Sequence, residues 1–358
     1  MTRSTLALHF NLVQDVSVLR PVAMLAARMD QACIFLISPD FCRLDTTGGW
    51  RTEIDRLAAE ITAPVIVYET LFDVVRALDG RSGLCIAGSE SDVRAHLGSH
   101  ALFRALPAHW LKVTLQHGYE CVGFLHNARH TAAMGHAITF AADMIVGWFE
   151  GSRLVDIAPS ERSKLYVAGP PMMIEPVASS GPKSTSGEQP PRGIICENTH
   201  SVRFASNTMR QSFLEQVDQF ARRFHAAGGE VDLRPHPAGQ FLKRTGFALP
   251  PGMSSREEPI YALDLTRYAF AVSAPSTVLF DFMLADVPVA LWGAQSLATS
   301  NYRGLLAVEG PEDLWAFAGA ALAARDTLLE VQRRFLAGLA MPPDVKARYQ
   351  SLISLAMR

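Results

Sequence analysis

The chain has 358 residues, which is more than a single hydrophobic core usually organises and is a suitable length for two domains. Apolar residues make up 49% and charged residues 19% of the sequence, a globular composition that excludes a disordered chain. The formal net charge is only −2, which argues against nucleic acid as a partner.

Cysteine usage and hydropathy indicate the compartment. The five cysteines form no CxxC pair, and Cys33, Cys85 and Cys196 lie inside apolar runs, so we expect reduced, buried thiols. No apolar run reaches the ~18 residues of a membrane span, and the N-terminal segment lacks the cleavage site of a signal peptide. The sequence therefore predicts a cytoplasmic protein, with peripheral attachment to the inner membrane left open.

The first half of the chain alternates short apolar runs with helical patterns. The helix expected over Trp50–Ile61 shows the pattern, because its apolar residues recur on one stripe. Strands are expected at Thr5–Phe10, Ala32–Ser38, Pro64–Tyr68, Gly83–Ala87, Leu111–Leu115 and Met144–Val146. Strands that alternate with helices of about three turns predict βαβ units and a parallel sheet.

The same α/β pattern begins again after a segment rich in Pro, Ser and Gly. We expect a first Rossmann-like domain over residues 1–172, a linker over 173–192, a second Rossmann-like domain over 193–340 and a C-terminal helix over 341–358. The helix could pack onto the first domain or touch a membrane, and packing is the favoured alternative. Elements expected in the second half are strands at Gly193–Cys196, Glu230–Arg234, Tyr268–Ser273 and Pro288–Trp292, and helices at Asn207–Ala227, Thr277–Ala285, Glu312–Ala324 and Pro343–Arg358.

Polar residues follow several of the expected strands. In an open parallel sheet, ligands bind beyond the carboxyl ends of the strands, so these residues are the site candidates. They are Gln116, His117, Gly118 and Glu120 after one strand, Glu197, Asn198, Thr199 and His200 after the next, His236 after a third, and Pro275, Ser276 and Thr277 after a fourth. Their gathering predicts a binding or catalytic edge.

Two of these segments suit the binding of phosphate. Ser276 or Thr277 precedes an expected helix, where it is either a simple N-cap or part of a phosphate site. Two prolines hold His236 in an extended backbone, with Arg234 on the same side of the strand. A rigid imidazole there suits a phosphate oxygen, and the alternative is a structural turn with a surface histidine.

The segment with His117 and Gly118 suits acid–base chemistry. His117 is either a general base or a buried histidine bonded to the backbone, and Glu120 could orient it or act as the base itself. Asp15, Asp40 and Glu90 also follow strands of the first half, and the sequence does not rank them.

A metal site is not expected. His126 and His130 are spaced i, i+4 on an expected helix, with His136 following, but the sequence HNARH lacks the glutamate of HExxH. The chain also lacks GxGxxG, a Walker motif and a DxD pair, which disfavours dehydrogenases, ATPases and metal-held diphosphates. We expect no metal and no cofactor, so that arginine, histidine and a helix dipole replace the charge of a metal.

Three segments resemble a known group of enzymes. Residues 116–118 (QHG), 234–237 (RPHP) and 273–292 (SAPSTVLFDFMLADVPVALW) are similar to segments of CDP-glycerol glycerophosphotransferases, capsule polysaccharide transferases and bacterial polysialyltransferases. The resemblance implies the B-type glycosyltransferase fold, with two Rossmann-like domains facing across a cleft and metal-independent transfer. It further implies that His236, Ser276 and Thr277 bind the phosphates of a CMP- or CDP-linked donor, and that His117 lies on the acceptor-side domain.

The resulting prediction is an inverting glycosyltransferase or polyol-phosphate transferase that acts in capsule or lipopolysaccharide synthesis. Its partners would be a nucleotide-activated donor and a glycan or lipid-linked acceptor. The expected catalytic residues are His117 and Glu120, and the expected donor-binding residues are Arg234, His236, Pro237, Ser273, Ser276, Thr277, Asn198 and Thr199. Two alternatives are a UDP-sugar 2-epimerase-like isomerase and a non-catalytic protein that binds nucleotide sugars or acts as a scaffold.

Overall fold

The computed structural model describes residues 4–175, 190–199, 204, 207–236, 241–293, 297 and 299–355. These residues form two compact units. The first contains the chain up to His126, Thr131–Glu175 and the segment from Ala340 onward. The second contains Asn127–His130 and Pro176–Leu339. The expected linker, 173–192, lies mostly outside the described residues.

The first unit is built on a seven-stranded parallel sheet. The strand order is β3-β2-β1-β4-β5-β6-β7, so the chain reverses its direction of winding between β1 and β4. In such a sheet the crevice beyond the strand ends at this switch point is the usual ligand site. The strands are β1 (Ser4–Phe10), β2 (Cys33–Ile37), β3 (Val65–Val67), β4 (Ser82–Ala87), β5 (Trp110–Leu115), β6 (Met144–Gly147) and β7 (Leu165–Val167).

Helices connect these strands and bury their apolar stripes against the sheet. In α3, Ile54, Leu57 and Ala58 are buried and Ile61 packs beside them, which confirms the stripe expected from the sequence. The connecting elements are α1 (Asp15–Arg28), α2 (Pro39–Leu44), α3 (Gly49–Ile61), α4 (Leu71–Ala77), η1 (Arg94–His96), α5 (Leu97–Ala105), α6 (Ala128–Met134), η2 (Pro159–Lys164) and η3 (Pro171–Ile174).

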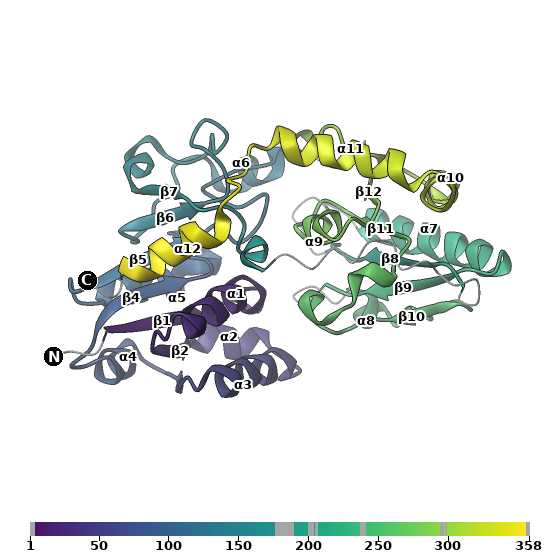
Figure 1. Ribbon diagram of the computed structural model, residues 1–358. Coiled ribbons are helices and arrows are strands. Elements are labelled where there is room, and N and C mark those ends of the chain that lie inside the picture. The colour runs from purple at the N-terminus through teal and green to yellow at the C-terminus, as the bar shows by residue number, and fades with distance from the viewer. Residues whose placement is uncertain are drawn as a thin grey trace. The chain divides into compact units, whose positions relative to one another are not determined.

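The C-terminal helix α12 (Val345–Ser354) packs onto the first unit. Val345, Tyr349 and Leu352 are buried in the same core as the strands of the first sheet. The Tyr349 hydroxyl donates a hydrogen bond of 3.2 Å to the carbonyl oxygen of Gly169. In Figure 1 this yellow helix lies among the purple to teal elements of the first unit. Packing, the favoured alternative for this segment, is therefore what the structure has.

The second unit repeats the architecture with six parallel strands. Their order is β10-β9-β8-β11-β12-β13, and the switch point lies between β8 and β11. The strands are β8 (Arg192–Cys196), β9 (Glu230–Arg234), β10 (Met253–Ser255), β11 (Phe270–Ser273), β12 (Val289–Trp292) and β13 (Ala307–Val308). The helices are α7 (Asn207–Ala226), α8 (Phe241–Thr245), α9 (Val278–Leu284), α10 (Pro311–Ala323) and α11 (Arg325–Gly338), with the 3-10 turns η4 (Ile260–Ala262), η5 (Leu265–Arg267) and η6 (Ser300–Tyr302).

Several elements differ from the sequence-based expectation. The short strands β7, β10 and β13 and the helix α11 were not expected. The strand expected from Tyr268 begins instead at Phe270, because Tyr268 closes a 3-10 turn and its hydroxyl donates a hydrogen bond of 2.9 Å to Asp232. Asp232 itself is fully buried between Arg192 and Arg256, so its charge is paired on both sides.

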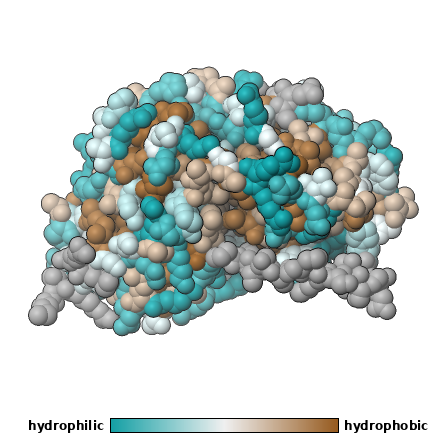
Figure 2. All heavy atoms as spheres, turned by 45° about the horizontal axis from the view of Figure 1, so that its top comes forward, coloured by the Kyte–Doolittle hydropathy of each residue, from teal (hydrophilic) through white to brown (hydrophobic). Residues whose placement is uncertain are grey.

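The surface carries a mixture of residue types. Figure 2 shows hydrophilic and hydrophobic residues interspersed over the face that it presents. The exposed large apolar residues of the described chain include Phe72 and Val155, at 70% and 60% exposure. Scattered residues of this kind are ordinary on a protein surface. Among the described residues, no helix has both the length and the hydropathy needed to cross a bilayer.

Candidate functional site

The switch point of the second sheet brings together the loops that follow β8 and β11. These strands are neighbours, with Cys196 and Ser273 in register at their carboxyl ends. The Ser273 hydroxyl donates to the Cys196 carbonyl oxygen over 3.3 Å, and the Asn198 side-chain amide donates to the Pro275 carbonyl oxygen over 2.5 Å. Both side chains are buried, and their hydrogen bonds hold the two segments together. The candidates predicted on these loops lie at one edge of the sheet.

Arg234 brings a buried positive charge to this edge. It ends β9 in register with Cys196, and its carbonyl oxygen accepts a hydrogen bond from the Glu197 backbone N–H at 2.9 Å. Only 7% of Arg234 is exposed, and its Nε has no hydrogen-bond partner within the described part of the chain. A buried guanidinium donor without a partner is energetically unfavourable, and a ligand, an ion or an ordered water would supply the missing acceptor.

Glu197 is a buried acceptor beside this donor. Only 1% of Glu197 is exposed, and one carboxylate oxygen accepts a hydrogen bond of 2.5 Å from the Thr199 hydroxyl. The other oxygen, Oε2, has no hydrogen-bond partner among the described residues. The edge thus offers both a cationic donor and a carboxylate acceptor. A ligand that satisfies both must carry an anionic group and a separate hydroxyl or amino donor.

Asp281 modulates the charge of this edge from α9. Burial raises the pKa of the Asp281 carboxyl to about 7, and the nearby Arg234 guanidinium opposes that rise. The charge of Asp281 near neutral pH therefore depends on how strongly Arg234 interacts with other anions. A bound anion would compete with Asp281 for the guanidinium.

The half-buried candidates of this unit lie on the same edge. Ser276 and Thr277 precede α9, and the Ser276 hydroxyl oxygen accepts a long hydrogen bond of 3.4 Å from the Val278 backbone N–H. The Thr277 side chain makes no capping hydrogen bond, so the N-cap interpretation is only weakly fulfilled. His236 is half-buried and follows β9 by two residues. Pro237 and His200 lie outside the described residues.

The switch point of the first sheet is closed by the protein's own groups. Asp15 is fully buried, and its carboxylate accepts hydrogen bonds from the backbone N–H groups of Asn11 and Leu12 and from the Ser89 hydroxyl, at 2.8–2.9 Å. Burial raises the pKa of the Asp15 carboxyl to about 7, although these hydrogen bonds oppose the rise. A side chain at Gly88 would contact Asp15 directly. At this switch point the Asp15 carboxyl is therefore engaged by the protein's own groups.

His117 follows the carboxyl end of β5, in a loop that the hydrogen bonds of Gln116 hold in place. The Gln116 side chain donates to the carbonyl oxygens of Gly118 and Tyr119 and accepts from the Trp148 backbone N–H, at 2.9–3.1 Å. His117 is half-buried, and its Nδ1 lies 3.4 Å from the Cys121 thiol. Glu120 is half-buried on the same loop. The buried glutamine therefore fixes the loop that carries both predicted catalytic residues.

Two histidines that the sequence analysis did not single out lie near His117. The His96 ring meets the His117 ring edge to face, with centroids 5.6 Å apart, and burial lowers the pKa of His96 to about 3. His100 lies on the first turn of α5, and its Nδ1 is 2.6 Å from a carboxylate oxygen of Glu90. The sequence signal for them is the spacing of two histidines four residues apart, after the segment Ser89-Glu90-Ser91 that follows β4.

The expected helical pair His126 and His130 is wrong, because His126 precedes α6, which begins at Ala128. His126 instead clusters with His136 and Asp156, whose ligand atoms all lie within 4.8 Å of one another. The Gly123 backbone N–H donates to His126 Nε2 at 2.7 Å, which places the proton of the neutral ring on Nδ1, facing Asp156. Within this cluster His136 Nδ1 lies 3.0 Å from Asp156 Oδ1, and His126 Nδ1 lies 3.8 Å from the same oxygen.

Comparisons with known proteins show the fold. No known family matches the chain, and no curated protein is similar to it in sequence. The wall teichoic acid polymerase TagF is similar in structure, with 9% identity, a TM-score of 0.63, and coverage of 99% of this chain and 88% of that one. A UDP-GlcNAc 2-epimerase of Methanocaldococcus jannaschii, in complex with UDP-GlcNAc and UDP, has 9% identity, a TM-score of 0.59, and coverage of 99% and 100%.

CalG4, the calicheamicin glycosyltransferase, has 14% identity and a TM-score of 0.56, and the match covers 100% of this chain and 99% of that one. At such low identities the likeness is one of fold. It confirms the predicted class, an α/β protein with two Rossmann-like domains of the B-type glycosyltransferase fold. The same fold serves transferases and epimerases, so the chemistry has to be argued from the site.

Proposed function

We propose that this protein is a metal-independent, inverting glycosyltransferase or polyol-phosphate transferase that uses a nucleotide-activated donor. The observation that carries the proposal is the carboxyl edge of the second sheet. There, the buried Arg234 has a free Nε donor and the buried Glu197 has a free carboxylate oxygen among the described residues. Both groups lie at the switch point where this class of sheet binds its ligands.

The donor phosphates would occupy the cationic side of this edge. Arginine offers a planar set of N–H donors that matches phosphate oxygens, and its charge persists at every physiological pH. His236 and the hydroxyls of Ser276 and Thr277 surround the same strand ends and would add further donors. In the transfer step, these groups would stabilise the negative charge that develops on the leaving phosphate, which is the task a metal performs elsewhere.

The nucleoside would lie beside Glu197, which is the hydrogen-bond acceptor of this edge. Glu197 cannot stabilise phosphate, because its carboxylate would repel it. A ribose hydroxyl or an exocyclic amino group is a suitable donor to Oε2, which supports a nucleotide rather than inorganic phosphate as the ligand. Asn198 and Thr199 belong to the same loop and hold its shape.

The finer assignment rests on the resemblance. Residues 116–118, 234–237 and 273–292 are similar to segments of transferases that use cytidine nucleotides, and a wall teichoic acid polymerase is among the similar structures. We therefore favour a CMP- or CDP-linked donor and a role in the synthesis of a capsule or lipopolysaccharide. The acceptor would be a glycan or a lipid-linked glycan, and peripheral contact with the inner membrane from the cytoplasmic side would follow from the latter.

A UDP-sugar 2-epimerase is the second candidate. It is favoured by the structural likeness to the epimerase of Methanocaldococcus jannaschii, which is as close as the likeness to the transferases. The loop after β11 has the sequence Ser273-Ala274-Pro275, where the epimerase interpretation calls for a Ser-Gly-Gly turn. A protein that binds nucleotide sugars without turnover is the non-enzymatic alternative.

The deciding experiment compares these outcomes directly. The purified protein is incubated with CDP-glycerol, CMP-sialic acid or UDP-GlcNAc, with and without capsule or lipopolysaccharide oligosaccharides, and products are identified by mass spectrometry and NMR. The proposal predicts release of CMP or CDP that depends on an acceptor, together with an extended glycan. Conversion of UDP-GlcNAc without an acceptor would establish the epimerase instead, and binding without any product would favour the non-catalytic protein.

A further inference from the structure

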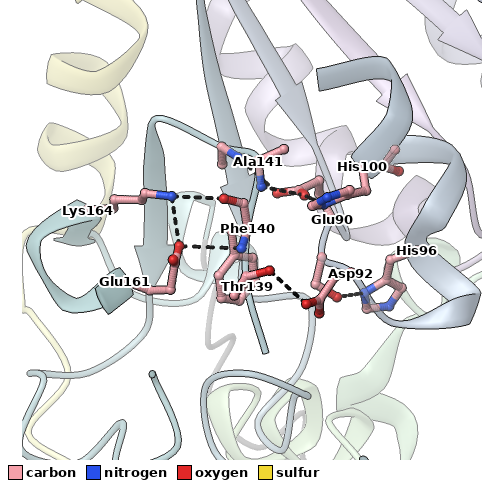
Figure 3. A network of polar contacts seen from close by, with 12 residues as sticks. Glu90, Asp92, His96, His100, Thr139, Phe140, Ala141, Glu161 and Lys164 are labelled. Atoms are coloured by element: carbon pink, nitrogen blue, oxygen red, sulfur yellow. Dashed lines mark hydrogen bonds and ion pairs between the residues drawn. The ribbon is translucent and has the colours of Figure 1, made fainter. Parts of the chain in front are cut away.

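A carboxylate–imidazole pair lies in the first unit at the carboxyl end of β4. Glu90 follows this strand by three residues, and His100 lies on the first turn of α5. The His100 Nδ1 atom is 2.6 Å from Glu90 Oε1 (Figure 3). Both residues therefore project from the edge of the sheet where parallel α/β proteins place their reacting groups.

The carboxylate of the pair is held firmly. The Glu90 side chain has no exposed surface, and it also accepts hydrogen bonds from the backbone N–H groups of Ala141, at 2.9 Å, and Ala142, at 3.3 Å. The segment that carries these N–H groups is itself anchored, since Lys164 donates to the Phe140 carbonyl oxygen over 2.8 Å (Figure 3). A carboxylate fixed in this way fixes the imidazole that it binds.

The pairing also settles which nitrogen of His100 can act. Burial raises the pKa of the Glu90 carboxyl, and the hydrogen bonds from Ala141 and His100 oppose that rise. When the carboxylate is ionised it only accepts hydrogen bonds, so the proton of the neutral His100 ring then lies on Nδ1 and the lone pair on Nε2. The His100 side chain is 16% exposed, unlike that of Glu90, so the ring reaches the surface of this edge. An imidazole with a carboxylate on Nδ1 and a lone pair on Nε2 has the arrangement of a general base.

The other histidines of this edge are engaged differently. His9 is fully buried, with Nε2 2.8 Å from the Tyr68 hydroxyl and Nδ1 3.2 Å from the Ser99 hydroxyl. His96 is 6% exposed and bonds to the Ser91 hydroxyl. His117 Nδ1 lies 3.4 Å from the Cys121 thiol. The bond to a fully buried carboxylate distinguishes His100 from His9, whose two ring nitrogens both face hydroxyl groups.

We propose that His100, positioned by Glu90, is the general base of the transfer reaction, an inference that rests on the proposed function. His100 Nε2 takes the proton of the acceptor hydroxyl while the hydroxyl oxygen forms a bond to the reacting carbon or phosphorus of the donor. The bond from that atom to the nucleotide phosphate breaks, and the phosphate leaves with the electron pair. The imidazolium that results is stabilised by Glu90 and later returns its proton to water.

The test uses substitutions that keep the hydrogen bond between residues 90 and 100 and remove either the nitrogen that accepts the proton or the charge of the carboxylate. In His100→Asn, the amide N–H takes the place of Nδ1 and keeps the bond to Glu90, while the accepting nitrogen Nε2 is lost. Glu90→Gln keeps the shape and removes the charge behind the ring. The matched control is His136→Asn, because His136 also places Nδ1 3.0 Å from a carboxylate, that of Asp156, but its side chain is 64% exposed. Transfer is measured with the donors and acceptors named above, with CDP binding and thermal unfolding measured on each variant.

We expect His100→Asn to lower kcat by roughly 100-fold or more, the usual contribution of a general base, with CDP binding and thermal unfolding unchanged. Glu90→Gln should lower kcat by about 10- to 100-fold, and His136→Asn should match the wild type. The loss should fall on kcat and leave the KM for the donor unchanged, because His100 would act only on the proton of the acceptor hydroxyl.

Three results would overturn the assignment. A folded His100→Asn variant that retains more than a third of the wild-type kcat contradicts it, and so does an equal loss in His136→Asn. If His100→Asn does not fold, His100→Gln takes its place, and an unchanged kcat in that variant contradicts the assignment equally. A wild-type protein that transfers nothing from any donor contradicts the proposed function itself, whereas an active wild type that is insensitive at His100 contradicts only the base.

Discussion

Phe270 lies directly over Gly193 in the core of the second unit. The two residues are register partners in the neighbouring strands β11 and β8, and a Cβ atom at Gly193 would overlap the Phe270 ring. The same ring meets those of Phe220, Phe224 and Phe317 edge to face. A glycine in β8 therefore leaves room for this aromatic cluster, which packs on the two strands whose ends form the proposed donor site.

Substitution at this position should weaken the second unit. Gly193→Ala forces the Phe270 ring to move within a packed core, and we expect a loss of about 1–3 kcal/mol in the free energy of unfolding. The control is Gly319→Ala in the middle of α10, where an added Cβ meets nothing within 4 Å. There, alanine should stabilise the helix by up to about 1 kcal/mol. Urea unfolding of both variants measures the difference, and equal stabilities would contradict the packing account.

Glu197 gives a prediction about which part of the ligand is recognised. Glu197→Gln preserves the shape of the side chain but replaces a carboxylate oxygen by an amide donor. We expect the affinity for CDP to fall about tenfold, the loss of one hydrogen bond to a charged group, while the affinity for pyrophosphate is unchanged or improved. Isothermal titration with both ligands gives the answer, and an equal loss for both would mean that Glu197 does not contact the nucleoside.

Asp15 predicts a pH dependence of stability in the first unit. Its pKa is about 7 in the folded protein and near its ordinary value of 3.8 when unfolded, so the folded state holds a proton that the unfolded state releases. The stability from this group is therefore complete below about pH 4 and is lost as the pH rises to about 7. Asp15→Asn removes that loss, since its amide can reverse the hydrogen bond with Ser89.

The measurement compares unfolding of the wild type and Asp15→Asn between pH 4.5 and pH 8. Across that range we expect the variant to gain on the wild type by at most about 3 kcal/mol, at about 1.4 kcal/mol for each pH unit up to the folded pKa. A difference between the two proteins that does not change with pH would show that Asp15 is ionised in the folded state throughout.

The C-terminal helix should contribute to the stability of the first unit. Leu352 is 1% exposed in the core of that unit, so Leu352→Ala should lower the free energy of unfolding by about 2–5 kcal/mol. Leu355, just beyond α12, is 37% exposed and serves as the control, with an expected change within about 0.5 kcal/mol. Equal, small effects at both positions would indicate that the helix detaches in solution.

Much of the fold could be predicted from the sequence, because buried parallel strands are continuous apolar runs. The strands β1 to β6 and the four central strands of the second unit were predicted to within a few residues. The strands β7, β10 and β13 were missed because they have only two or three residues, with at most one buried side chain each. A run that short carries too little periodicity to differ from a loop.

The positions of several candidate residues were predictable because they end or follow a strand. Arg234 and Ser273 end their strands, Asn198, Thr199 and Ser276 follow theirs, and the structure has them at one edge of the sheet, while their role stays a prediction. The Glu90–His100 pair could not be predicted, because His100 lies within a helix and meets Glu90 only when α5 folds back. Arg234 Nε and Glu197 Oε2 lack a hydrogen-bond partner among the described residues. The sequence could not predict this, because hydrogen-bond partners are determined by the folded chain.

The measurement that tests the central claim most directly is nucleotide binding to the Arg234 site. Thermal shift and isothermal titration are performed with CMP, CDP, UDP, GDP and ADP on the wild type, on Arg234→Met and on Arg222→Met, whose side chain is 58% exposed on α7. We predict selective binding of a cytidine nucleotide that weakens about 10- to 100-fold in Arg234→Met and is unchanged in Arg222→Met. If no nucleotide binds the wild type, or if Arg234→Met binds as well as the wild type does, the donor site is not at this edge.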